Sequence, residues 1–243
     1  QLLHLSKKYI NVIFIFFFSQ AFCQKVVDTI FKVEYENIIT IEDDKKKSSS
    51  IPVYFELITS NRESNFKQIE RVINTQSSTY FFQSDKGLLY KDLIEKKYLK
   101  EEDLGNKKYL IKDDLLALKW SISNKDSIII NEKVFLATLE KDNKSIKAWF
   151  KPSEISNGPY LYNGLPGVIL YLEEIFYHKD ENNTVEKQIF KAVDIKDVNN
   201  KKIKIPEERK NTIIVSKKEM EFLKKEYYDK QMNYFKSKSE VKN

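Results

Sequence analysis

A regular alternation of apolar and polar side chains near the start of the chain constrains the fold more than any other feature. Even-numbered positions in this stretch are mostly Asp, Lys and Glu, whereas odd-numbered positions are mostly apolar: Val27, Thr29, Phe31, Val33, Tyr35, Asn37, Ile39 and Ile41. Successive side chains of a β-strand point to opposite faces of its sheet. A period of two over this length therefore predicts a half-buried antiparallel strand, or a pair of such strands.

Short apolar segments separated by turn signals continue along most of the chain. Strand-length segments occur at 53–57, 79–83, 88–90, 109–111, 117–122, 127–130, 134–140 and 146–150, and longer ones at 168–177 and 186–195. A charged loop is expected at 42–50, a polar break at 61–65 and a separating turn at 124–126. This spacing is typical of an antiparallel meander, an open barrel or a sandwich. The sequence thus predicts one mainly β domain over residues 25–215, with no linker to a second domain.

The C-terminus changes from a strand period to a helical one. Ser216 and Glu219 have the spacing of a capping box, in which the two side chains satisfy the first free N–H groups of a helix. Four apolar residues then fall near one helical face: Met220, Leu223, Tyr227 and Tyr234. We expect an α-helix from about 217 to 236 within a C-terminal segment, 216–243, packed on the edge of the sheet. Because this helix is rich in lysine, binding to an anionic membrane surface is the alternative.

The first 24 residues have the layout of a secretory signal peptide. Lys7 and Lys8 precede an unbroken apolar run at 12–18, and Ala21-Phe22-Cys23 offers a cleavage site. The run is much shorter than the roughly 20 apolar residues that cross a bilayer as a helix, so no transmembrane span is expected in the mature chain. The predicted location is outside the cytoplasm: the periplasm, the periphery of the outer membrane or the extracellular space. Because the chain begins with Gln1 rather than Met, we expect its extreme N-terminus to be truncated or misassigned.

Cys23 is the only cysteine of the chain. Cleavage after Cys23 or after Gln24 would leave a mature domain without a thiol, and such a domain must be stabilised by its own core. Attachment of a lipid to Cys23 is the alternative, although Gln20 and Phe22 differ from the residues that bacterial lipoproteins generally place before that cysteine. A domain without cysteine has no thiol nucleophile and no thiolate zinc site.

Residue counts and spacing argue against several other kinds of chemistry. Beyond the first 24 residues, 40 basic residues face 36 acidic ones, and the two signs are interspersed, so we expect no nucleic-acid partner. The single histidine of the mature chain, His178, is expected in an exposed turn rather than in a catalytic triad. Glu173 and Glu174 are adjacent in a predicted strand and should point to opposite faces, one of them toward solvent. The sequence accordingly indicates no catalytic residue, no metal ligand and no cofactor.

One stretch, Trp149–Glu174, concentrates unusual residues. It contains Gly158-Pro159 and, six residues later, Gly164-Leu165-Pro166-Gly167. Glycine permits backbone conformations that other residues resist, Pro166 fixes its own φ, and a residue before proline is pushed out of the helical region. This composition predicts a rigid corner that enters a buried strand at Val168. The corner sets the register of the fold, or alternatively its exposed residues Tyr160, Tyr162 and Asn163 form a recognition surface.

The same stretch resembles the GLPGLI family of exported proteins from Gram-negative bacteria, which is named after this hexapeptide. Here the hexapeptide reads Gly164-Leu165-Pro166-Gly167-Val168-Ile169, with Val in place of the second Leu, and it is flanked by Gly158-Pro159-Tyr160 and Ala148-Trp149-Phe150. The segment at 118–122 also matches the family pattern. Many members carry a cysteine between the two tryptophans, whereas residues 134–138 contain none here. The resemblance implies an exported protein without a settled activity, often associated with outer-membrane TonB-dependent receptors.

Three hypotheses on function follow. The first is a non-enzymatic binding or accessory protein of the cell envelope, with a concave apolar face and an outer-membrane receptor or another envelope protein as partner. The second is a secreted surface-interaction protein without a ligand pocket. The third is a hydrolase that needs two acidic residues converging in one cleft. A cavity lined by inward-facing aromatic residues would favour the first hypothesis over the second.

Overall fold

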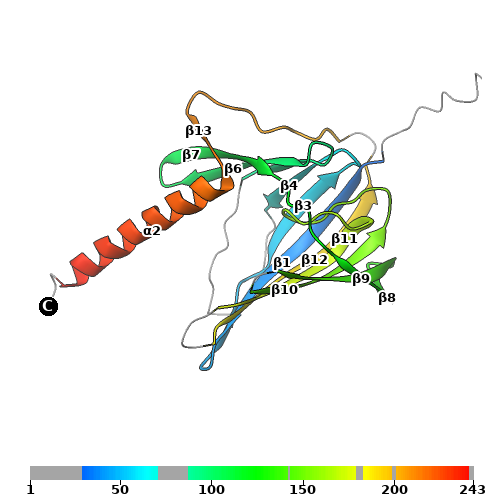
Figure 1. Cartoon of the computed structure of the whole chain (residues 1–243), viewed down its shortest axis with the longest axis horizontal. Helices are drawn as coiled ribbons and strands as arrows, with labels where there is room; N and C mark the ends of the chain where they lie inside the picture. Colours follow the sequence, from blue (N-terminus) through cyan, green and yellow to red (C-terminus); the bar gives the residue numbers. More distant parts are fainter. Residues whose placement is uncertain (1–28, 71–86, 142, 179–182, 199–200, 241–243) are drawn as a thin grey trace, which may run out of the picture.

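The computed structural model describes residues 29–70, 87–141, 143–178, 183–198 and 201–240, which form one large sheet and one helix (Figure 1). The elements are β1 (Phe31–Glu42), β2 (Lys47–Ser49), β3 (Val53–Thr59), β4 (Glu63–Ile69), β5 (Leu89–Asp92), β6 (Lys97–Leu104), β7 (Lys107–Asp114), β8 (Ser121–Ile129), β9 (Glu132–Lys141), β10 (Lys144–Pro152), β11 (Gly167–Tyr177), β12 (Val185–Asp197), β13 (Thr212–Val215) and α2 (Lys217–Glu240). This confirms the mainly β fold with a C-terminal helix. The predicted signal peptide at 1–24 and the predicted strand at 79–83 lie outside the described residues.

The strand order shows how the sheet is assembled. It runs β13-β7-β6-β5-β4-β3-β1-β12-β11-β10-β9-β8, with β2 paired to β1 beside this path. Thus β1 lies in the middle and joins two antiparallel meanders, β3 to β7 and β8 to β12. The edge strand β13 pairs with β7 in parallel, which makes the sheet mixed. Among the described strands β8 and β13 do not pair with each other, so the sheet is open rather than closed into a barrel.

The alternation at the start of the chain has the predicted structural effect. Val33, Tyr35 and Asn37 on β1 are fully buried, whereas the residues between them are only partly covered. The phenol of Tyr35 donates a hydrogen bond of 2.5 Å to the Ile169 carbonyl on β11, a strand that is not adjacent to β1 in the sheet. The sheet therefore curls, and side chains from both meanders meet on its inner face.

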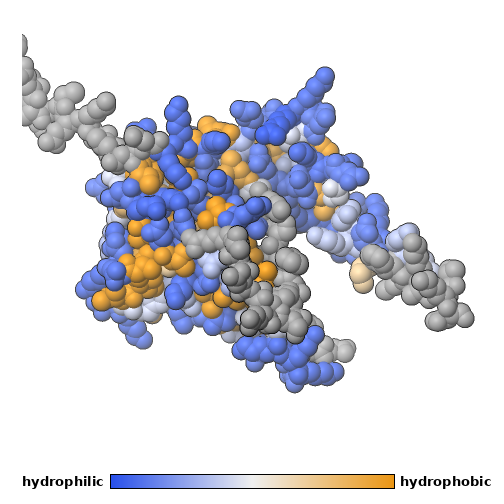
Figure 2. All heavy atoms as spheres, turned by 180° about the vertical axis from the view of Figure 1, so that it is seen from behind, coloured by the Kyte–Doolittle hydropathy of each residue, from blue (hydrophilic) through white to orange (hydrophobic). Residues whose placement is uncertain are grey.

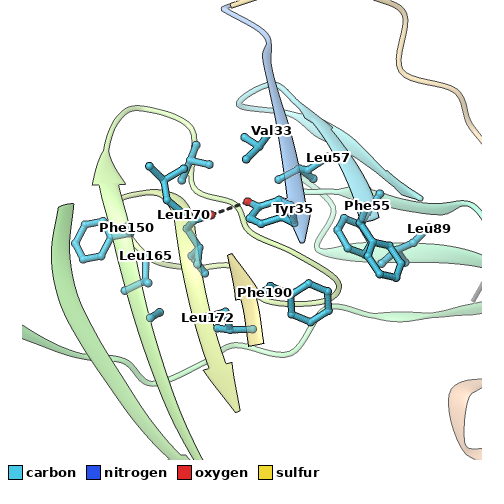
Figure 3. Close-up of a cluster of buried hydrophobic side chains, with 14 of the residues drawn as sticks. Val33, Tyr35, Phe55, Leu57, Leu89, Phe150, Leu165, Leu170, Leu172 and Phe190 are labelled. Carbon is cyan, nitrogen blue, oxygen red and sulfur yellow. Dashed lines mark hydrogen bonds between the residues drawn. The ribbon is translucent and has the colours of Figure 1, made fainter. Parts of the chain in front are cut away.

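Aromatic and aliphatic residues from both halves fill this inner face (Figure 3). Phe55 and Phe66 stack with ring centroids 5.0 Å apart, and Phe190 of β12 meets Phe55 edge-on at 5.8 Å. Offset and edge-to-face pairs of this kind add to the stabilisation from burial alone. From the other half, Phe150, Leu165, Leu170 and Leu172 close the same cluster. The core thus holds the two meanders together across the curl.

Four local predictions are wrong. The polar segment 61–65 contains the start of β4, where Asn65 is buried because it donates a 2.6 Å hydrogen bond to the Lys204 carbonyl and accepts one from the Lys204 N–H. The charged loop at 42–50 contains the short strand β2. The turn expected at 124–126 is an irregularity inside one strand, β8, whose register shifts between Ile122 and Asp126. Trp120 lies in the segment before β8 rather than on a strand.

The exposed edge of the sheet at β8 is largely polar. Figure 2 shows a mostly hydrophilic surface interrupted by several apolar patches. Two exposed apolar residues, Ile122 and Ile128, belong to β8, but Lys125 and Asp126 at the register shift separate them. Charged residues and irregular pairing at an edge strand discourage further strand addition.

The C-terminal helix begins at the predicted residue and is somewhat longer than predicted. Its capping box is formed: the Glu219 N–H donates to the Ser216 Oγ at 3.2 Å, and the Ser216 N–H donates to Glu219 Oε2 at 2.7 Å. Asp113 of β7 accepts a further hydrogen bond from the Lys217 N–H at 2.9 Å. These contacts fix the first turn of the helix to the sheet.

Among the side chains of α2 that the structure describes, those near its N-terminus pack against the sheet. Met220 is fully buried, whereas Tyr234, expected on the same packed face, is 52% exposed. The difference arises because the helix projects away from the sheet (Figure 1). No helix in the described residues is long and apolar enough to span a membrane.

Replacing the capping serine should loosen this helix. Ser216→Ala removes the acceptor of the Glu219 N–H, and loss of such a cap costs about 1 kcal/mol. We expect amide hydrogen exchange in the first turns of α2 to become about fivefold faster. Ser237→Ala, which removes a hydroxyl near the projecting end, is the control and should leave those amides unchanged. Equal exchange in both variants would show that the cap does not hold the helix.

Candidate functional site

The corner that carries the hexapeptide connects β10 to β11 and is tightly packed. A Cβ on Gly167 would lie 2.0 Å from the Lys151 carbonyl oxygen, and one on Gly158 would lie 2.6 Å from Ile169 Cδ1. Leu165, Val168 and Ile169 are buried. The Ile169 N–H donates to the Asn157 carbonyl at 2.9 Å, so the beginning of the corner is held against the strand that follows it. The rigid corner expected from the glycines and prolines is therefore present.

A fully buried polar cluster anchors the corner to the opposite half of the sheet. Lys91 of β5 donates from Nζ to Asn157 Oδ1 at 2.5 Å and to the Gly158 carbonyl at 2.9 Å. Asn157 in turn donates from Nδ2 to Thr59 Oγ1 of β3 at 2.8 Å. Since β10 and β11 belong to one meander and β3 and β5 to the other, the corner bridges the two halves of the curled sheet.

Two tyrosines of the corner reach opposite walls. Tyr160, which adopts a φ of 50°, lies under the Lys100 Nζ of β6, 5.2 Å from its ring centroid. Tyr162 donates its phenolic hydrogen to Glu174 of β11, which also pairs with Lys144 of β10. Burial, followed by the negative charge of Glu174, raises the pKa of the Tyr162 phenol, so it acts as a proton-bearing donor at neutral pH.

The corner does not present the exposed recognition surface that the sequence suggested as an alternative. Tyr160, Tyr162 and Asn163 are half-buried, and the Asn163 carbonyl accepts a 2.9 Å hydrogen bond from the Trp120 indole N–H. Trp149 is half-buried on β10 and packs against the core, and Pro159 is buried. Gly164 and Pro166 are the exposed residues of the hexapeptide, and Gly164 has a φ of 87°. The corner therefore serves as an inner wall more than as an outer surface.

A cavity of about 840 Å³ opens beside the corner. Tyr160, Leu161 and Tyr162 form one wall, the inner face of the sheet forms the floor, and the first turns of α2 complete the rim. The apolar lining residues come from both meanders and the corner: Phe55, Phe66, Leu89, Tyr98, Leu115, Leu116, Leu118, Leu139, Ile146, Tyr160, Leu161, Tyr162 and Phe190. The inward aromatic residues of the sheet are thus brought to one open cavity.

Charge around this cavity is unevenly distributed. Among the described lining residues, seven are lysines (Lys67, Lys100, Lys141, Lys144, Lys217, Lys218 and Lys224) and four are acids (Asp113, Asp114, Glu174 and Glu221). Three of the acids are engaged within the protein. Glu174 pairs with Lys144 and Tyr162, Asp113 accepts from the Lys217 N–H, and Glu221 lies 3.9 Å from the Lys217 Nζ. Five of the seven lysines are paired as well: Lys67 with Glu56, Lys100 and Lys224 with Glu102, Lys144 with Glu174, and Lys217 with Glu221. The lining is therefore largely apolar, with an excess of lysines over acids among its charged residues.

Glu173 and Glu174 point to opposite faces of β11, as predicted, but neither is a freely solvated carboxylate. Glu173 is 8% exposed and pairs with Lys187 at 2.6 Å and Lys147 at 3.4 Å on the outer face. Desolvation alone would raise the pKa of Glu173, but the hydrogen bond and charge of Lys187, with help from Lys147, hold it below its usual value. The expected solvent-facing carboxylate is thus buried in an ion-pair network.

The remaining candidates for chemistry lie apart from the cavity. His178 lies at the end of β11, with its Nε2 3.5 Å from Glu186 and its ring against Phe176. Within the described part of the chain, no three His, Cys, Asp or Glu residues gather in a way that could hold a metal ion.

Lys91, Lys100 and Asn157 were not singled out from the sequence. A signal for the first was present, since Lys91 has the same parity as the apolar Leu89 in a short strand and should point to the same side. The pairing of Lys91 with a corner 66 residues later in the chain had no local signal.

Comparisons with known proteins identify the fold only. No protein-family model matches the chain, and no curated protein matches it in sequence. Two crystal forms of PNGF-II, in space groups C2 and P21, match with TM-scores of 0.51 at 13% and 12% identity over 82% of this chain. The chain spans about a third of PNGF-II, 32% and 34% of the two structures. A DUF1329 family protein from Desulfovibrio piger, with a TM-score of 0.18 at 9% identity over 70% of this chain and 87% of that protein, is too dissimilar to inform the fold.

Proposed function

We propose that this chain is an exported binding protein of the cell envelope, of the GLPGLI type, whose cavity takes an apolar ligand that carries an anionic group. The observation that carries this proposal is the cavity of about 840 Å³ between the inner face of the sheet, the corner and α2. Its volume is within the range of ligand pockets, about 300–1,000 Å³, which are typically apolar with a few placed polar groups. An open sheet with aromatic residues on its inner face is suited to binding rather than to surface display alone.

The distribution of charge supports an anionic group on the ligand. Lysines outnumber acids in the lining by seven to four, and although five of the lysines are paired with carboxylates, Lys141 and Lys218 add positive charge beside them. Burying an apolar ligand on Phe55, Phe66 and Phe190 would supply most of the affinity, at about 25 cal/mol per Å². The lysines at the rim would then select ligands with a negative charge and orient them toward the solvent side.

The export segment and the resemblance to the GLPGLI family support the location and the partner. In this proposal the protein acts outside the cytoplasm, in the periplasm, at the outer-membrane periphery or extracellularly, and delivers or presents its ligand to an outer-membrane receptor of the TonB-dependent type or to another envelope protein. It works without catalysis or a cofactor. A surface-interaction role without a pocket is less well supported, because the tyrosines that would form its patch are half-buried and line the cavity.

A charge placed at the mouth of the cavity tests this proposal. Leu116 lines the cavity but is 56% exposed, so it can be changed with little cost to stability. Leu116→Glu should weaken binding of the anionic apolar dye anilinonaphthalene sulfonate by about threefold to tenfold, because the added carboxylate repels the sulfonate at short range. The measurement is a fluorescence titration at low salt.

Two matched variants serve as controls. Leu116→Lys has a side chain of similar length and should bind the dye at least as well as the wild type does. Ile122→Glu introduces the same negative charge on edge strand β8, outside the cavity lining, and should have no effect. Equal affinities for the Glu and Lys variants at position 116, or no saturable binding by the wild type, would show that the cavity does not bind such a ligand. Native mass spectrometry of the protein isolated from its own envelope would identify the natural ligand.

A further inference from the structure

Lys91 is a fully buried lysine in the centre of the inner face. Its Nζ donates to Asn157 Oδ1 and to the Gly158 carbonyl, both in the corner. Among the residues that the structure describes, no carboxylate lies within ion-pair distance of this nitrogen. A buried lysine without a charged partner is costly, and a buried polar group that the fold retains usually has a specific role in positioning.

The groups that face Lys91 come from every neighbouring element. Ser64 of β4 and Tyr98 of β6 are its cross-strand partners, and Asp113 of β7 lies opposite Tyr98 in the same row. Lys100, on the same face of β6, is opposite Leu89 in the adjacent row. Asn157 and Gly158 of the corner cover the Lys91 side chain on the side away from these strands. The charged groups on this face of β6 and β7 thus include Lys100 and Asp113, and neither is a direct hydrogen-bond partner of Lys91.

The contacts of Lys91 lead directly to the ligand cavity. Only Pro159 separates Gly158 from Tyr160, and Tyr160 to Tyr162 form the cavity wall. The far side of this wall is held by the bond from Tyr162 to Glu174 and by the bond from the Trp120 indole to the Asn163 carbonyl. On the near side, the two hydrogen bonds of Lys91 link the start of the wall to β5, next to the bond from Asn157 to Thr59 of β3.

We propose that Lys91 is a positioning residue of the cavity, which holds Asn157 and Gly158 so that Tyr160 and Tyr162 stand in the wall that contacts the ligand. This inference rests on the proposed function for its effect on binding, but its effect on the corner is independent of any ligand.

The charge state of Lys91 makes this positioning sensitive to pH. Burial lowers the pKa of the Lys91 amine to about 7. Above that pH the amine is neutral and donates to both corner acceptors without the cost of a buried charge. Below it, protonation favours any arrangement in which water reaches the nitrogen, so the corner should loosen as the pH falls. A purely structural lysine on the surface would show no such dependence near neutrality.

The test compares Lys91→Met with Lys97→Met, an exposed lysine on the neighbouring strand. One readout is the hydrogen-exchange rate of the Trp120 indole N–H, which reports on the corner through its bond to Asn163 and is assigned with a Trp149→Phe reference. At equal pH we expect about tenfold faster exchange in Lys91→Met than in the wild type, and no change in Lys97→Met. The second readout is the affinity for anilinonaphthalene sulfonate, whose sulfonate keeps its charge over the whole pH range used.

The expected affinity for the dye depends on pH in the wild type and not in Lys91→Met. The wild type should lose about fivefold or more in affinity between about pH 8.5 and about pH 6, while Lys91→Met should bind weakly at both values, like the wild type at low pH. Unchanged indole exchange in Lys91→Met would overturn the positioning role, whatever the dye does. Faster exchange without dye binding by the wild type would contradict the proposed function and leave the positioning role supported. If Lys91→Met does not fold, the pH profile of the wild type decides: a flat dye affinity across pH 7 would overturn the inference.

Discussion

Gly167→Ala is expected to destabilise the folded chain by at least about 3 kcal/mol. A Cβ at this position would lie 2.0 Å from the Lys151 carbonyl oxygen and 2.8 Å from the Lys151 carbonyl carbon, and both atoms belong to the backbone of β10. A backbone contact cannot be relieved by a side-chain rotation, so β10 and β11 would have to separate where they pair. Urea denaturation followed by circular dichroism would measure the change in the free energy of unfolding.

Gly164→Ala is the matched comparison within the same hexapeptide. Gly164 has a φ of 87°, so an alanine there is strained by about 1–2 kcal/mol, but its Cβ would meet no atom closer than 3.9 Å. We therefore expect the Gly164 variant to lose clearly less stability than the Gly167 variant. If the two lose the same amount, close approach of β10 is not the reason for glycine at position 167.

Lys91→Met is expected to remove a rise in stability that the wild type shows between about pH 7 and about pH 9. The pKa of this amine is about 7 in the fold, whereas the ordinary value for a lysine is 10.5, so in this interval the unfolded chain binds more protons than the folded chain. Stability must then increase with pH, by up to about 1.4 kcal/mol per pH unit and about 2 kcal/mol over the interval. Below about pH 7 both states are protonated, and the contribution of this group to the slope disappears.

The slope of stability against pH distinguishes the effect of the lysine charge from the effect of the lost hydrogen bonds. Lys91→Met also removes the donor of the Gly158 carbonyl and one of the two donors of Asn157 Oδ1, which keeps the Gly158 N–H, and this loss lowers stability at every pH. Denaturation curves for the wild type, Lys91→Met and the exposed control Lys97→Met should therefore give two parallel pH profiles and one flatter one. A Lys91→Met profile that parallels the wild type would contradict the burial of a neutral lysine in the fold.

Local patterns in the sequence were sufficient for the elements that depend on local rules. The alternation around Val33 and Tyr35 predicted β1, and the capping box at Ser216 and Glu219 predicted the first residue of α2. The glycines and prolines at 158–167 predicted the tight corner. The capping box and the corner depend on interactions between residues close together in the chain. The alternation of β1 follows directly from the burial of one face of the strand.

Other elements could not be found because partners distant in the chain create them. β4 begins among polar residues that look like a break, and its Asn65 is buried only because residue 204 returns to bond it. β6 also lacks a clear alternation, since its inward positions include Lys100, a buried lysine that packs against Tyr160. β13 is four residues long and forms by parallel pairing with β7, about a hundred residues earlier. Such strands are stabilised by pairing with strands that are distant in the sequence, so a short stretch of sequence does not predict them.

The candidate site could likewise be predicted in part from local sequence, and the rest depended on partners distant in the chain. The sequence pointed to the corner at Gly158–Ile169 and suggested that Tyr160, Tyr162 and Asn163 would face outward. The curl of the sheet placed them inward instead, because Lys91 and Thr59 hold the corner across the opening between the two meanders, while Glu174 of β11 holds Tyr162 from the corner's own half. The cavity beside the corner therefore has no signature of its own in the sequence.

By itself, the sequence determined the strands that have a clear apolar pattern, the helix and the glycine-dependent corner, since these follow from side-chain period, capping and φ. Only the tertiary structure decided that β1 joins two meanders, that the corner bridges them, and that a lysine is buried beneath it. The physical reason is that these features depend on burial and hydrogen bonds between residues far apart in the chain. Local conformational propensity does not determine which distant residues meet.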